Sequence, residues 1–413
     1  MSSSADIVIV GAGIIGLCTA LQLARRTHAK ILVLDKGAGP GEGSTGASSA
    51  VCRFKYTRPD TVNLARDGIA AYQNWSEFVG LKAPLAQFHR HGVLWFADGR
   101  PDWPAQEAER LAAHGIRAAV LDDQQLRERF PALNPCTIPP DLENGDAHAC
   151  GAGGLHLLEL DGGYMDPVDA LQDLLTALRA LGVDVRFRAG VAGIRTHGGA
   201  VLGVSLANGE RVGCEHVVNA AGPWCNEIFA HVGLDCPWPL KPTRIQVVHV
   251  DRPTDVVGDI PVAVDPLSGI YFRSQSRGQE VIVGSILEED EREVIERPDE
   301  YARFVEDDFA QTKLHALQHR IPAFSIRGKV RGYSGLYTIN ASDVHPVVGK
   351  TAVRGFYVAN GCSGHGFKLA PAIGSLIAQE IAGKAGAFDT DVAPSFLSFD
   401  RAPMAIASKS VLA

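Results

Sequence analysis

The chain has 413 residues, of which 46% are hydrophobic and 21% are charged, values typical of a globular protein with a large core. Its formal net charge of −8 argues against nucleic acid as a partner, because no basic excess exists to neutralise phosphates. No run of about eighteen apolar residues appears, so we expect no transmembrane helix. Only five residues precede the first apolar segment, which predicts that there is no signal peptide.

Eight cysteines are scattered along the chain, with no C-x-x-C pair and no Cys/His cluster in zinc-finger spacing. We therefore expect no metal site from the sequence. Scattered free thiols are typical of a reducing compartment, which predicts a cytoplasmic protein. Most of these cysteines are expected to be small buried hydrophobic residues.

The N-terminal region has the pattern of a nucleotide-binding unit. Residues 7–10 predict a buried strand, residues 14–26 a helix and residues 31–34 a second strand. The turn between the first strand and the helix carries three glycines in the spacing G-x-G-x-x-G, namely Gly11, Gly13 and Gly16. A strand, a glycine turn, a helix and a second strand in this order are typical of dinucleotide binding.

Each glycine of this turn has a physical role. Gly11 permits the tight turn, Gly13 lets the backbone approach a pyrophosphate at the helix N-terminus, and Gly16 lets helix and strand pack closely. Asp35 follows the second strand, where a carboxylate can accept hydrogen bonds from a ribose. We therefore expect a dinucleotide in this region.

The rest of the chain alternates helical and strand patterns. Helices are predicted near residues 61–80, 105–114, 122–130, 167–181 and 371–382. Strands are predicted near residues 91–97, 184–188, 200–206, 216–219, 244–250, 269–273 and 280–285. The strongly acidic segment 288–308 predicts a solvated helix face.

Two later segments, residues 217–224 and 355–368, each run from a strand into a glycine-rich turn. Together with the N-terminal unit they favour one nucleotide domain assembled from three distant stretches. The antiparallel segments between them would form a second domain.

These three stretches together resemble the FAD-dependent oxidoreductases of the D-amino-acid oxidase and sarcosine oxidase superfamily, and are most similar to the branch of the sarcosine oxidase β-subunit. Residues 51–56, V-C-R-F-K-Y, are similar to an I-I-R-x-x-Y-like element of that branch, and residues 363–367 read S-G-H-G-F as they do there. A third element of the branch matches here at Gly335, Leu336, Tyr337, Asp343, Pro346 and Gly349.

The resemblance implies an α/β fold with a Rossmann-like FAD-binding domain and an antiparallel-sheet substrate domain of α+β type. The FAD-binding domain is expected to be discontinuous and to comprise residues 1–82, 150–225 and 325–413. The substrate domain is expected to comprise residues 83–149 and 226–324.

The resemblance also implies FAD rather than NAD as the cofactor. Monomeric sarcosine oxidases attach FAD through a cysteine at a place where this chain has Gly335 after Ser334, so we expect non-covalent FAD. The residues expected to contact the cofactor are Gly11, Gly13, Ile14, Ile15, Gly16, Asp35, Lys36, Ser44, Thr45, Ser48, Ser49, Val191, Ala221, Gly222, Trp224, Tyr337, Gly364, His365, Gly366, Phe367 and Lys368.

In this family an arginine and a lysine near the flavin hold the substrate carboxylate, and Arg53 and Lys368 occupy those positions here. An arginine offers a planar bidentate fork and a lysine adds a point charge, so the pair suits a carboxylate. Tyr56 and Tyr271 are expected to close the pocket or to donate hydrogen bonds to the substrate. No general base is predicted, because amine oxidation by hydride transfer needs a neutral amine rather than a dedicated base.

Other polar residues near these motifs are weaker candidates. If Lys55 also faces the pocket, a second anionic group on the substrate is expected, and Arg58 is a similar candidate. His365, within the glycine turn, is expected to be structural or to face the flavin. His345 precedes Pro346 and is expected to face solvent.

The electron acceptor is suggested by one position of the second domain. Family members that react with oxygen use a pocket lysine there, and Ile282 aligns with it. An apolar residue supplies no charge to stabilise superoxide, which favours a dehydrogenase that passes electrons to a quinone or a carrier protein over an oxidase that uses oxygen. The sequence is compatible with either a homo-oligomer or a hetero-oligomer.

The function predicted from the resemblance is oxidation of the C–N bond of an amino acid, either a secondary or N-methylated amine or a cyclic imino acid, by hydride transfer to flavin N5. The imine would then hydrolyse. Two alternatives remain open. One is a flavin dehydrogenase of a 2-hydroxy acid, and the other is a flavin subunit that is active only within a hetero-oligomeric complex.

Overall fold

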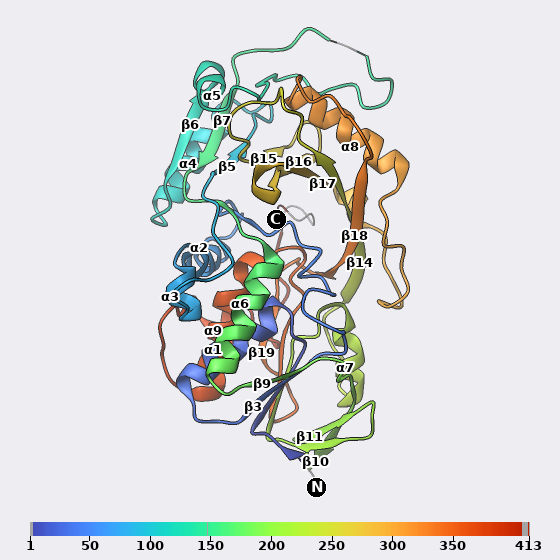
Figure 1. Ribbon diagram of the computed structural model, residues 1–413. Helices are drawn as coiled ribbons and strands as arrows, with labels where there is room; N and C mark the ends of the chain where they lie inside the picture. Colours follow the sequence, from blue (N-terminus) through green and yellow to red (C-terminus); the bar gives the residue numbers. More distant parts are fainter. Residues whose placement is uncertain (1–2, 147, 407–411, 413) are drawn as a thin grey trace.

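The computed structural model describes residues 3–146, 148–406 and 412, and it is built around two large sheets that lie one above the other in Figure 1. The lower sheet has six strands in the order β19-β20-β13-β2-β3-β9. Its strands are β2 (Ile7–Val10), β3 (Ile31–Leu34), β9 (Asp184–Arg186), β13 (His216–Asn219), β19 (Val347–Lys350) and β20 (Phe356–Asn360). All neighbours are parallel except the edge pair β19–β20.

The six-stranded sheet is covered on both faces, which explains why its strands are apolar throughout. Ile7 and Ile9 of β2 belong to a core shared with helices, whereas Val8 and Val10 belong to a second core on the opposite face. The helices of the first core are α1 (Ile14–Arg26), α2 (Pro59–Gln73), α3 (Trp75–Val79), α6 (Pro167–Ala180) and α9 (Gly366–Ala382). The second core is closed by α7 (Cys225–His231) and by a four-stranded sheet of β1 (Ser3–Ser4), β10 (Val191–His197), β11 (Ala200–Leu206) and β12 (Arg211–Gly213).

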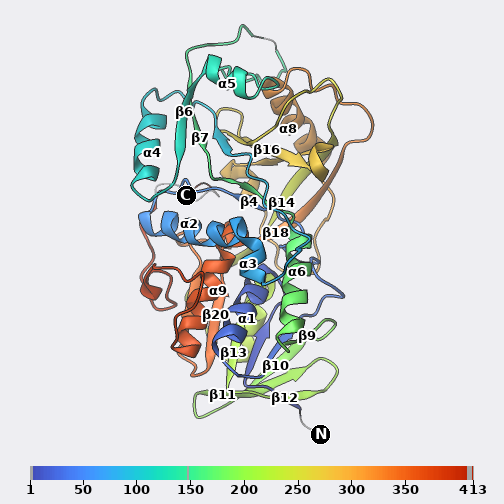
Figure 2. The same cartoon turned by 60° about the vertical axis from the view of Figure 1, so that its left-hand side comes forward.

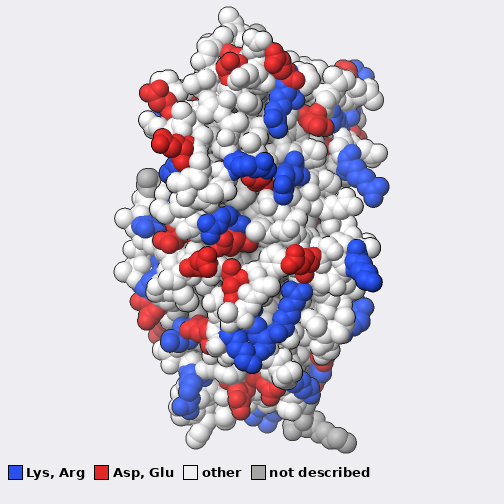
Figure 3. Space-filling model, turned by 90° about the vertical axis from the view of Figure 1, so that its left-hand side faces the viewer, with Lys and Arg blue, Asp and Glu red and all other residues white. Residues whose placement is uncertain are grey.

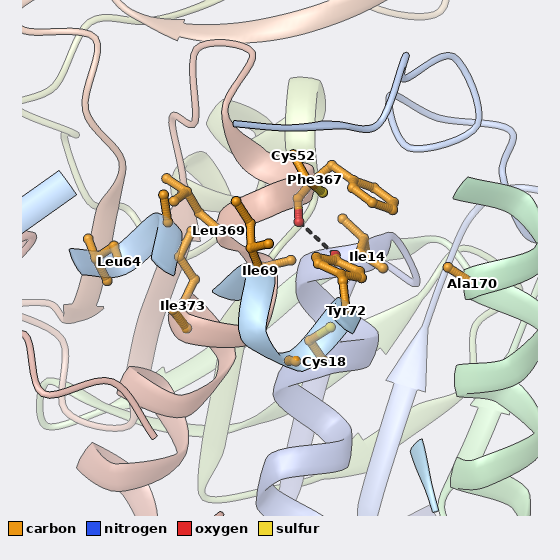
Figure 4. Close-up of a cluster of buried hydrophobic side chains, with 14 of the residues drawn as sticks. Ile14, Cys18, Cys52, Leu64, Ile69, Tyr72, Ala170, Phe367, Leu369 and Ile373 are labelled. Carbon is orange, nitrogen blue, oxygen red and sulfur yellow. Dashed lines mark hydrogen bonds between the residues drawn. The ribbon is translucent and has the colours of Figure 1, made fainter. Parts of the chain in front are cut away.

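Figure 2 shows the helices of the first core gathered beside the lower sheet. The beginning of α9 is fixed there by α2 (Figure 4). Pro371 has no N–H to give to the carbonyl of Phe367, and the Tyr72 hydroxyl donates to that carbonyl at 2.7 Å instead. A Cβ on Gly68 of α2 would lie 2.3 Å from the backbone oxygen of Lys368, so α2 presses directly on the first turn of α9.

The upper sheet has eight strands in the order β18-β14-β17-β16-β15-β5-β7-β6. Its strands are β5 (Val93–Trp95), β6 (Ala118–Asp122), β7 (Leu155–Glu159), β14 (Leu240–Asp251), β15 (Val262–Asp265), β16 (Ile270–Gln275), β17 (Glu280–Ser285) and β18 (Arg331–Asn340). Neighbours are antiparallel apart from the parallel pair β15–β5. The helices of this half are α4 (Trp103–Ala112), α5 (Asp123–Arg129) and α8 (Asp307–Arg320), and a short pair, β4 (Val51–Cys52) and β8 (Gly163–Tyr164), completes the strands.

The predicted α/β fold with a Rossmann-like half is confirmed, and the differences are local. The helix expected over residues 61–80 is divided at Asn74 into α2 and α3. The strands β7 and β18 pair within the upper sheet, although the expected boundaries assign their residues to the FAD-binding domain. The division into domains by residue number stays a prediction.

Most acids of the segment 288–308 are exposed, as expected for a solvated face, but the predicted helix is wrong. Only short 3-10 turn geometry occurs before α8 begins, and several of the acids are partners of buried cations. Glu293 and Glu306 each accept from the buried guanidinium of Arg244 at 2.8 Å, and Asp290 accepts from the buried Lys313 at 2.7 Å. The acids therefore compensate internal charge.

Within the described residues, no helix is both long enough and apolar enough to cross a membrane.

Figure 3 shows that acidic and basic side chains are interspersed over one face of the molecule.

Candidate active site

A cavity of about 680 Å³ opens at the carboxyl ends of the parallel strands of the lower sheet. Val10, Leu34, Ala220 and Asn360 end or follow four adjacent strands of that sheet, and all four line the cavity. In open α/β sheets this edge is the usual place of nucleotide binding.

The glycine turn after β2 is shaped by contacts within the protein. A Cβ on Gly11, which has φ +109°, would lie 2.3 Å from the oxygen of Ala220, and a Cβ on Gly16 would lie 2.0 Å from the oxygen of Gly11. Gly13 lines the cavity directly before α1 and, as a glycine, offers no side chain to cap the helix. The N–H of Ile14 donates to the Thr45 hydroxyl at 3.1 Å, so the first-turn N–H groups after Ile14 are the ones that an anion at the wall of the cavity could use.

Asp35 is oriented by the backbone at the end of β3. Its carboxylate accepts from the N–H of Ala12 at 2.7 Å and from the N–H of Gly37 at 2.7 Å. A carboxylate has about four lone-pair sites, so Asp35 keeps capacity for two further donors such as a ribose diol.

The other end of the cavity is formed by two loops and strand β18, which are far apart in the sequence. The hydroxyl of Ser44 donates to the backbone oxygen of Leu336 at 2.5 Å. A Cβ on Gly335 would lie 2.5 Å from the Cβ of Ala47, so a cysteine at position 335 would displace this loop. Ser363 takes a φ of +45° beside Gly364, and its hydroxyl oxygen accepts a hydrogen bond from the Asn340 N–H at 2.9 Å.

Most of the expected cofactor contacts line this cavity. They are Gly11, Gly13, Ile14, Ile15, Asp35, Lys36, Ser44, Thr45, Ser48, Val191, Ala221, Gly222, Trp224, Tyr337, Gly364, Gly366 and Phe367. The structure places four others elsewhere: Gly16 packs against Gly11, His365 is buried against Tyr56, and Ser49 and Lys368 line a smaller cavity.

One wall of the large cavity was not predicted. Asp299 and Arg303 line it, although they belong to the acidic region that carries no motif. Asp299 pairs with Lys36 at 2.6 Å and accepts from the indole N–H of Trp224 at 3.2 Å, and the Lys36 ammonium lies 4.3 Å from the centre of a Trp224 ring. These three side chains join loops of the two halves at the mouth of the cavity.

A second cavity of about 50 Å³ adjoins the first one, since Ser48, Tyr337, Gly364 and Phe367 line both. Its remaining polar lining includes Arg53, Lys368, Tyr271 and Ser49. The structure therefore brings together three of the four residues expected to act on the substrate.

Arg53 is almost fully buried, with 4% of its surface exposed. It donates a hydrogen bond to the backbone oxygen of Lys55, and its guanidinium lies 4.1 Å from the centre of the Tyr56 ring. Tyr56 itself lines neither cavity, so its contact is with Arg53 and with the ring of His365, 5.1 Å away. The structure gives Tyr56 a supporting position beneath the guanidinium.

The loop that carries Arg53 is held by Glu159 of β7, which the sequence analysis missed. The buried Glu159 carboxylate accepts from the N–H groups of Phe54 at 2.6 Å and Lys55 at 3.0 Å, and from the indole of Trp95 at 2.9 Å. Burial raises the pKa of the Glu159 carboxyl, and these hydrogen bonds act in the opposite direction. No local pattern marks Glu159, because its partners lie about a hundred residues away in the chain.

Lys368 lies in the first turn of α9, and 4% of its surface is exposed. Burial, reinforced by the nearby charge of Arg53, lowers the pKa of Lys368 to about 7. Lys368 forms no ion pair with any residue that the structure describes. Two buried cationic side chains on one small cavity suit an anionic ligand, to which both can donate charge-assisted hydrogen bonds.

Tyr271 on β16 reaches the small cavity because its cross-strand neighbour on β17 is Gly284. A Cβ on Gly284 would lie 2.4 Å from the Tyr271 ring, so only glycine leaves the space that the ring occupies. Burial raises the pKa of Tyr271, which keeps its hydroxyl protonated as a donor.

The weaker candidates lie outside both cavities. Lys55 sits 4.4 Å from the centre of the Trp95 ring, and Arg58 donates to the backbone oxygen of Ala405 at 3.0 Å. The expectation that His345 faces solvent is wrong. His345 is buried, and its Nε2 lies 3.0 Å from the Thr61 hydroxyl.

Ile282 is buried on β17 opposite Arg273 of β16. The guanidinium of Arg273 donates to the backbone oxygens of Ser49 at 2.6 Å and Ser274 at 2.7 Å. Neither side chain lines either cavity. The cation beside Ile282 is therefore Arg273, and its guanidinium is already engaged by backbone oxygens.

The residues of the large cavity fit an FAD. Its volume falls within the range usual for cofactor sites, the N-terminus of α1 suits a pyrophosphate, and Asp35 suits a ribose. The glycines of the wall leave room for a group larger than water, since a Cβ on Gly222 would meet no protein atom within 4 Å. The isoalloxazine would lie toward the small cavity, where the two cavities share residues.

Comparison with known proteins identifies the family. A family profile described as "DAO: FAD dependent oxidoreductase" matches residues 6–380, which is most of the chain. The chain belongs to this family of FAD-dependent oxidoreductases. Its cofactor is accordingly FAD.

Curated relatives cover nearly the whole chain at low identity. FAD-dependent oxidoreductase domain-containing protein 1 of Bos taurus is 28% identical, over 91% of this chain and 81% of its own length. Sarcosine oxidase subunit beta of Rhizobium meliloti is 25% identical, over 91% of this chain and 84% of its own length.

Solved structures share the fold. The L-proline dehydrogenase of P. horikoshii superposes with a TM-score of 0.78 at 21% identity, covering 97% of this chain and 98% of that chain. The glycine oxidase of Geobacillus kaustophilus gives a TM-score of 0.75 at 21% identity, covering 97% and 100% of the two chains.

Proposed function

We propose that this family member oxidises the C–N bond of a small amino acid whose amine is secondary, N-methylated or part of a ring. The observation that carries the proposal is the pair of buried cations, Arg53 and Lys368, in a small cavity that adjoins the cofactor cavity. FAD, when bound, accepts the hydride that leaves the carbon next to the nitrogen. The resulting imine then hydrolyses to a carbonyl compound and an amine.

The two cations hold the substrate carboxylate in this proposal. Arg53 supplies a planar fork for two parallel hydrogen bonds, and Lys368 supplies a third donor and a second positive charge. Fixing the carboxylate aims the adjacent C–H bond at the cofactor cavity, and such orientation contributes a large part of the rate of a bimolecular step. Tyr271 lines the same small cavity, where its neutral hydroxyl is a hydrogen-bond donor for the substrate.

The amine class is supported by the names of relatives and structural neighbours. They include sarcosine oxidase subunit beta, dimethylglycine dehydrogenase and L-proline dehydrogenase. The matched part is 42% of the length of the mouse dimethylglycine dehydrogenase, so that relative carries regions without a counterpart here. The small volume beside Arg53 favours a substrate with a short side chain.

The electron acceptor proposed for the reduced cofactor is a quinone or a carrier protein rather than oxygen. The support is that the position that carries a lysine in oxygen-reacting family members here carries Ile282, an apolar side chain that lines neither cavity. The guanidinium of Arg273 is engaged by two backbone oxygens and lines neither cavity. We also propose a reducing, cytoplasmic location, supported by the eight cysteines, all of which are free.

The proposal is tested by following the flavin absorbance without oxygen while single compounds are added. The panel contains matched pairs that differ in one group, N-methylalanine against lactate and proline against tetrahydrofuran-2-carboxylate. Bleaching by the amine of each pair and not by its oxygen analogue is the expected result. Bleaching by the 2-hydroxy acid alone would contradict the amine assignment.

Two controls complete this experiment. Readmission of air reports the acceptor, and slow recovery of the oxidised spectrum beside fast recovery with a soluble quinone is expected. Flavin that no compound bleaches until an extract fraction is added would favour the alternative of a subunit active only in a complex.

A further inference from the structure

The long connection between α5 and β7, at the top of Figure 1, brings three potential metal ligands together. The Sγ atoms of Cys136 and Cys150 and a ring nitrogen of His148 all lie within 4.8 Å of one another. The Cys136 Sγ is 3.4 Å from Nε2 of His148. None of these residues lines either cavity of the active site.

A fourth candidate comes from the last turn of α8. The ring of His319 lies 5.1 Å from the ring of His148, measured between centroids. Its Nε2 is buried and has no hydrogen-bond partner among the described residues. A buried imidazole nitrogen without a partner is costly, and a bound cation would remove that cost.

The backbone around these side chains is held in place by Asn134. Its Oδ1 accepts from the N–H of Cys136 at 3.2 Å, and its Nδ2 donates to the Cys150 Sγ at 3.4 Å and to the His319 oxygen at 3.1 Å. A donor aimed at sulfur stabilises a thiolate and is typical of the surroundings of a metal site. One amide thus links the two cysteines to α8.

The buried ion pair of Arg320 and Asp265 supports the segment that carries Cys136. Arg320 donates to the carbonyls of Asn134 at 3.1 Å and Cys136 at 2.6 Å. Its remaining donors engage Asp265 at 2.6 and 2.8 Å, and both side chains are fully buried. The ligand cluster is therefore preorganised on the rigid end of α8 and the upper sheet.

We propose that Cys136, Cys150, His148 and His319 bind one structural Zn²⁺ ion. Two thiolates and two imidazoles are the ligand set that zinc prefers in tetrahedral sites, and softer sulfur ligands disfavour magnesium and calcium. Binding displaces one proton from each cysteine thiol to solvent, so the ion's two charges are balanced by two thiolates. Binding requires the His319 ring, whose centre lies 5.1 Å from that of His148, to rotate into the fourth ligand position.

The sequence analysis expected no metal because the ligands do not follow zinc-finger spacing. Cys150 follows His148 after one residue, whereas His319 is distant in the chain and comes from a helix. A site of this kind fastens the connection to α8. It has no position left for a water or a substrate, which makes its role structural.

The competing chemistry at this place is a disulfide between Cys136 and Cys150, which would need an oxidant and would leave both histidines without a role. The test uses the full-length holoprotein, prepared with a reducing agent, stripped of metal by a chelator and then loaded with Zn²⁺. Metal content is measured by mass spectrometry after gel filtration. About one zinc per chain is expected.

The variants are Cys150→Ser and His319→Asn, with Cys236→Ser as a matched control. Cys150 is exposed, so its substitution is compatible with folding, and Cys236 is a partly buried thiol outside the cluster. Bound flavin reports that each variant is folded. We expect zinc affinity to fall at least about 100-fold in the two cluster variants and to stay unchanged in the control.

Cobalt provides a second readout that does not depend on activity. Co²⁺ bound to the protein should give a sulfur-to-metal charge-transfer band and tetrahedral ligand-field bands on the long-wavelength side of the flavin. Both should vanish in Cys150→Ser and persist in Cys236→Ser. Absence of zinc from the reduced protein, a Cys136–Cys150 cross-link as its only modification, or equal zinc in all variants would overturn the proposal.

Discussion

The two cavities of the active site are built in different ways. The larger cavity is lined mainly by turns at the ends of parallel strands, and glycines such as Gly11 and Gly13 shape it. The smaller cavity is lined by large side chains, including Arg53, Lys368 and Tyr271, from segments that lie far apart in the chain. Backbone geometry therefore holds the common cofactor, whereas buried side chains determine the specific substrate.

The two cavities should also differ in the amino-acid substitutions that they tolerate. At the tight glycine turn of the larger cavity, a carbon added to Gly11 or to Gly16 behind it meets backbone atoms, which cannot move without displacing a strand or a helix. In the smaller cavity a substitution removes charge or a hydrogen bond and leaves the fold intact. Changes at the glycine turn should therefore abolish the holoprotein, and changes in the smaller cavity should alter catalysis.

The largest effect is expected for Gly16→Ala. Its Cβ would lie 2.0 Å from the backbone oxygen of Gly11, so α1 must move away from β2. We expect a loss of at least about 3 kcal/mol in the free energy of unfolding and little bound FAD. Thermal unfolding and the flavin content of the purified protein measure both quantities.

Gly39→Ala is the control for this prediction. Gly39 lines the larger cavity, but its Cβ would meet no atom within 4 Å, unlike that of Gly16. It should bind FAD like the unmodified protein. Equal losses in the two variants would show that close packing at Gly16 is not the cause.

The next effect is expected for Arg53→Gln. Arg53 and Lys368 both donate to the substrate carboxylate in this account. Removing one of them should cost about 3–4 kcal/mol in transition-state binding, or roughly 100- to 1,000-fold in kcat/KM. FAD content should not change, because Arg53 lines only the smaller cavity. Arg58→Gln, a substitution outside both cavities, should stay within about threefold. Similar losses in both variants would argue against a carboxylate contact at Arg53.

Glu159→Gln should have a smaller effect, because Glu159 positions the Arg53 loop without lining a cavity. In the unmodified protein three N–H groups donate to the carboxylate oxygens of Glu159. The amide of glutamine replaces one of these oxygens with an NH₂ donor, so at least one N–H group loses its acceptor, which costs about 1–3 kcal/mol. We expect kcat/KM to fall about 10- to 100-fold with FAD content preserved. The Arg53→Gln Glu159→Gln double variant should lose little beyond Arg53→Gln. Additive losses would instead assign Glu159 an independent role.

The smallest effect is a pH dependence of ligand binding. The pKa of Lys368 is lowered to about 7 by burial, so its cation is present below that pH and is lost as the pH rises through it. A short carboxylate without an amine should bind best below pH 7, and its Kd should rise up to about tenfold per pH unit above it. Spectral titration of the flavin measures this Kd. Lys368→Met should bind weakly at every pH, and a dependence that persists in that variant would contradict the assignment.

The same contrast explains how much the sequence predicted. The turn around Gly11, the strand that ends at Asp35 and the loop at Ser44 are local patterns, and the structure places all three at one cavity. Glu159 and Asp299 escaped prediction because their partners are distant in sequence. Arg53 and Lys368 were found through the family resemblance and not through a physical pattern in the chain.

Two errors have the same origin. His345 was expected at the surface, but the protein buries it against Thr61, which belongs to a helix far earlier in the chain. The acidic segment was expected to be a helix face because charge runs usually are, whereas its partners Arg244 and Lys313 become adjacent to it only in the folded protein. Charge runs show their role only when the buried counter-charges are known.

The most direct test of the account compares one amino acid with its own amide. The rate of anaerobic flavin reduction is measured for N-methylalanine and for N-methylalaninamide, in the unmodified protein and in Arg53→Gln. The account predicts that the acid reduces the flavin roughly 100-fold faster or more, and that the substitution removes most of this difference. Equal rates for acid and amide in the unmodified protein would contradict the claim that Arg53 and Lys368 hold a substrate carboxylate.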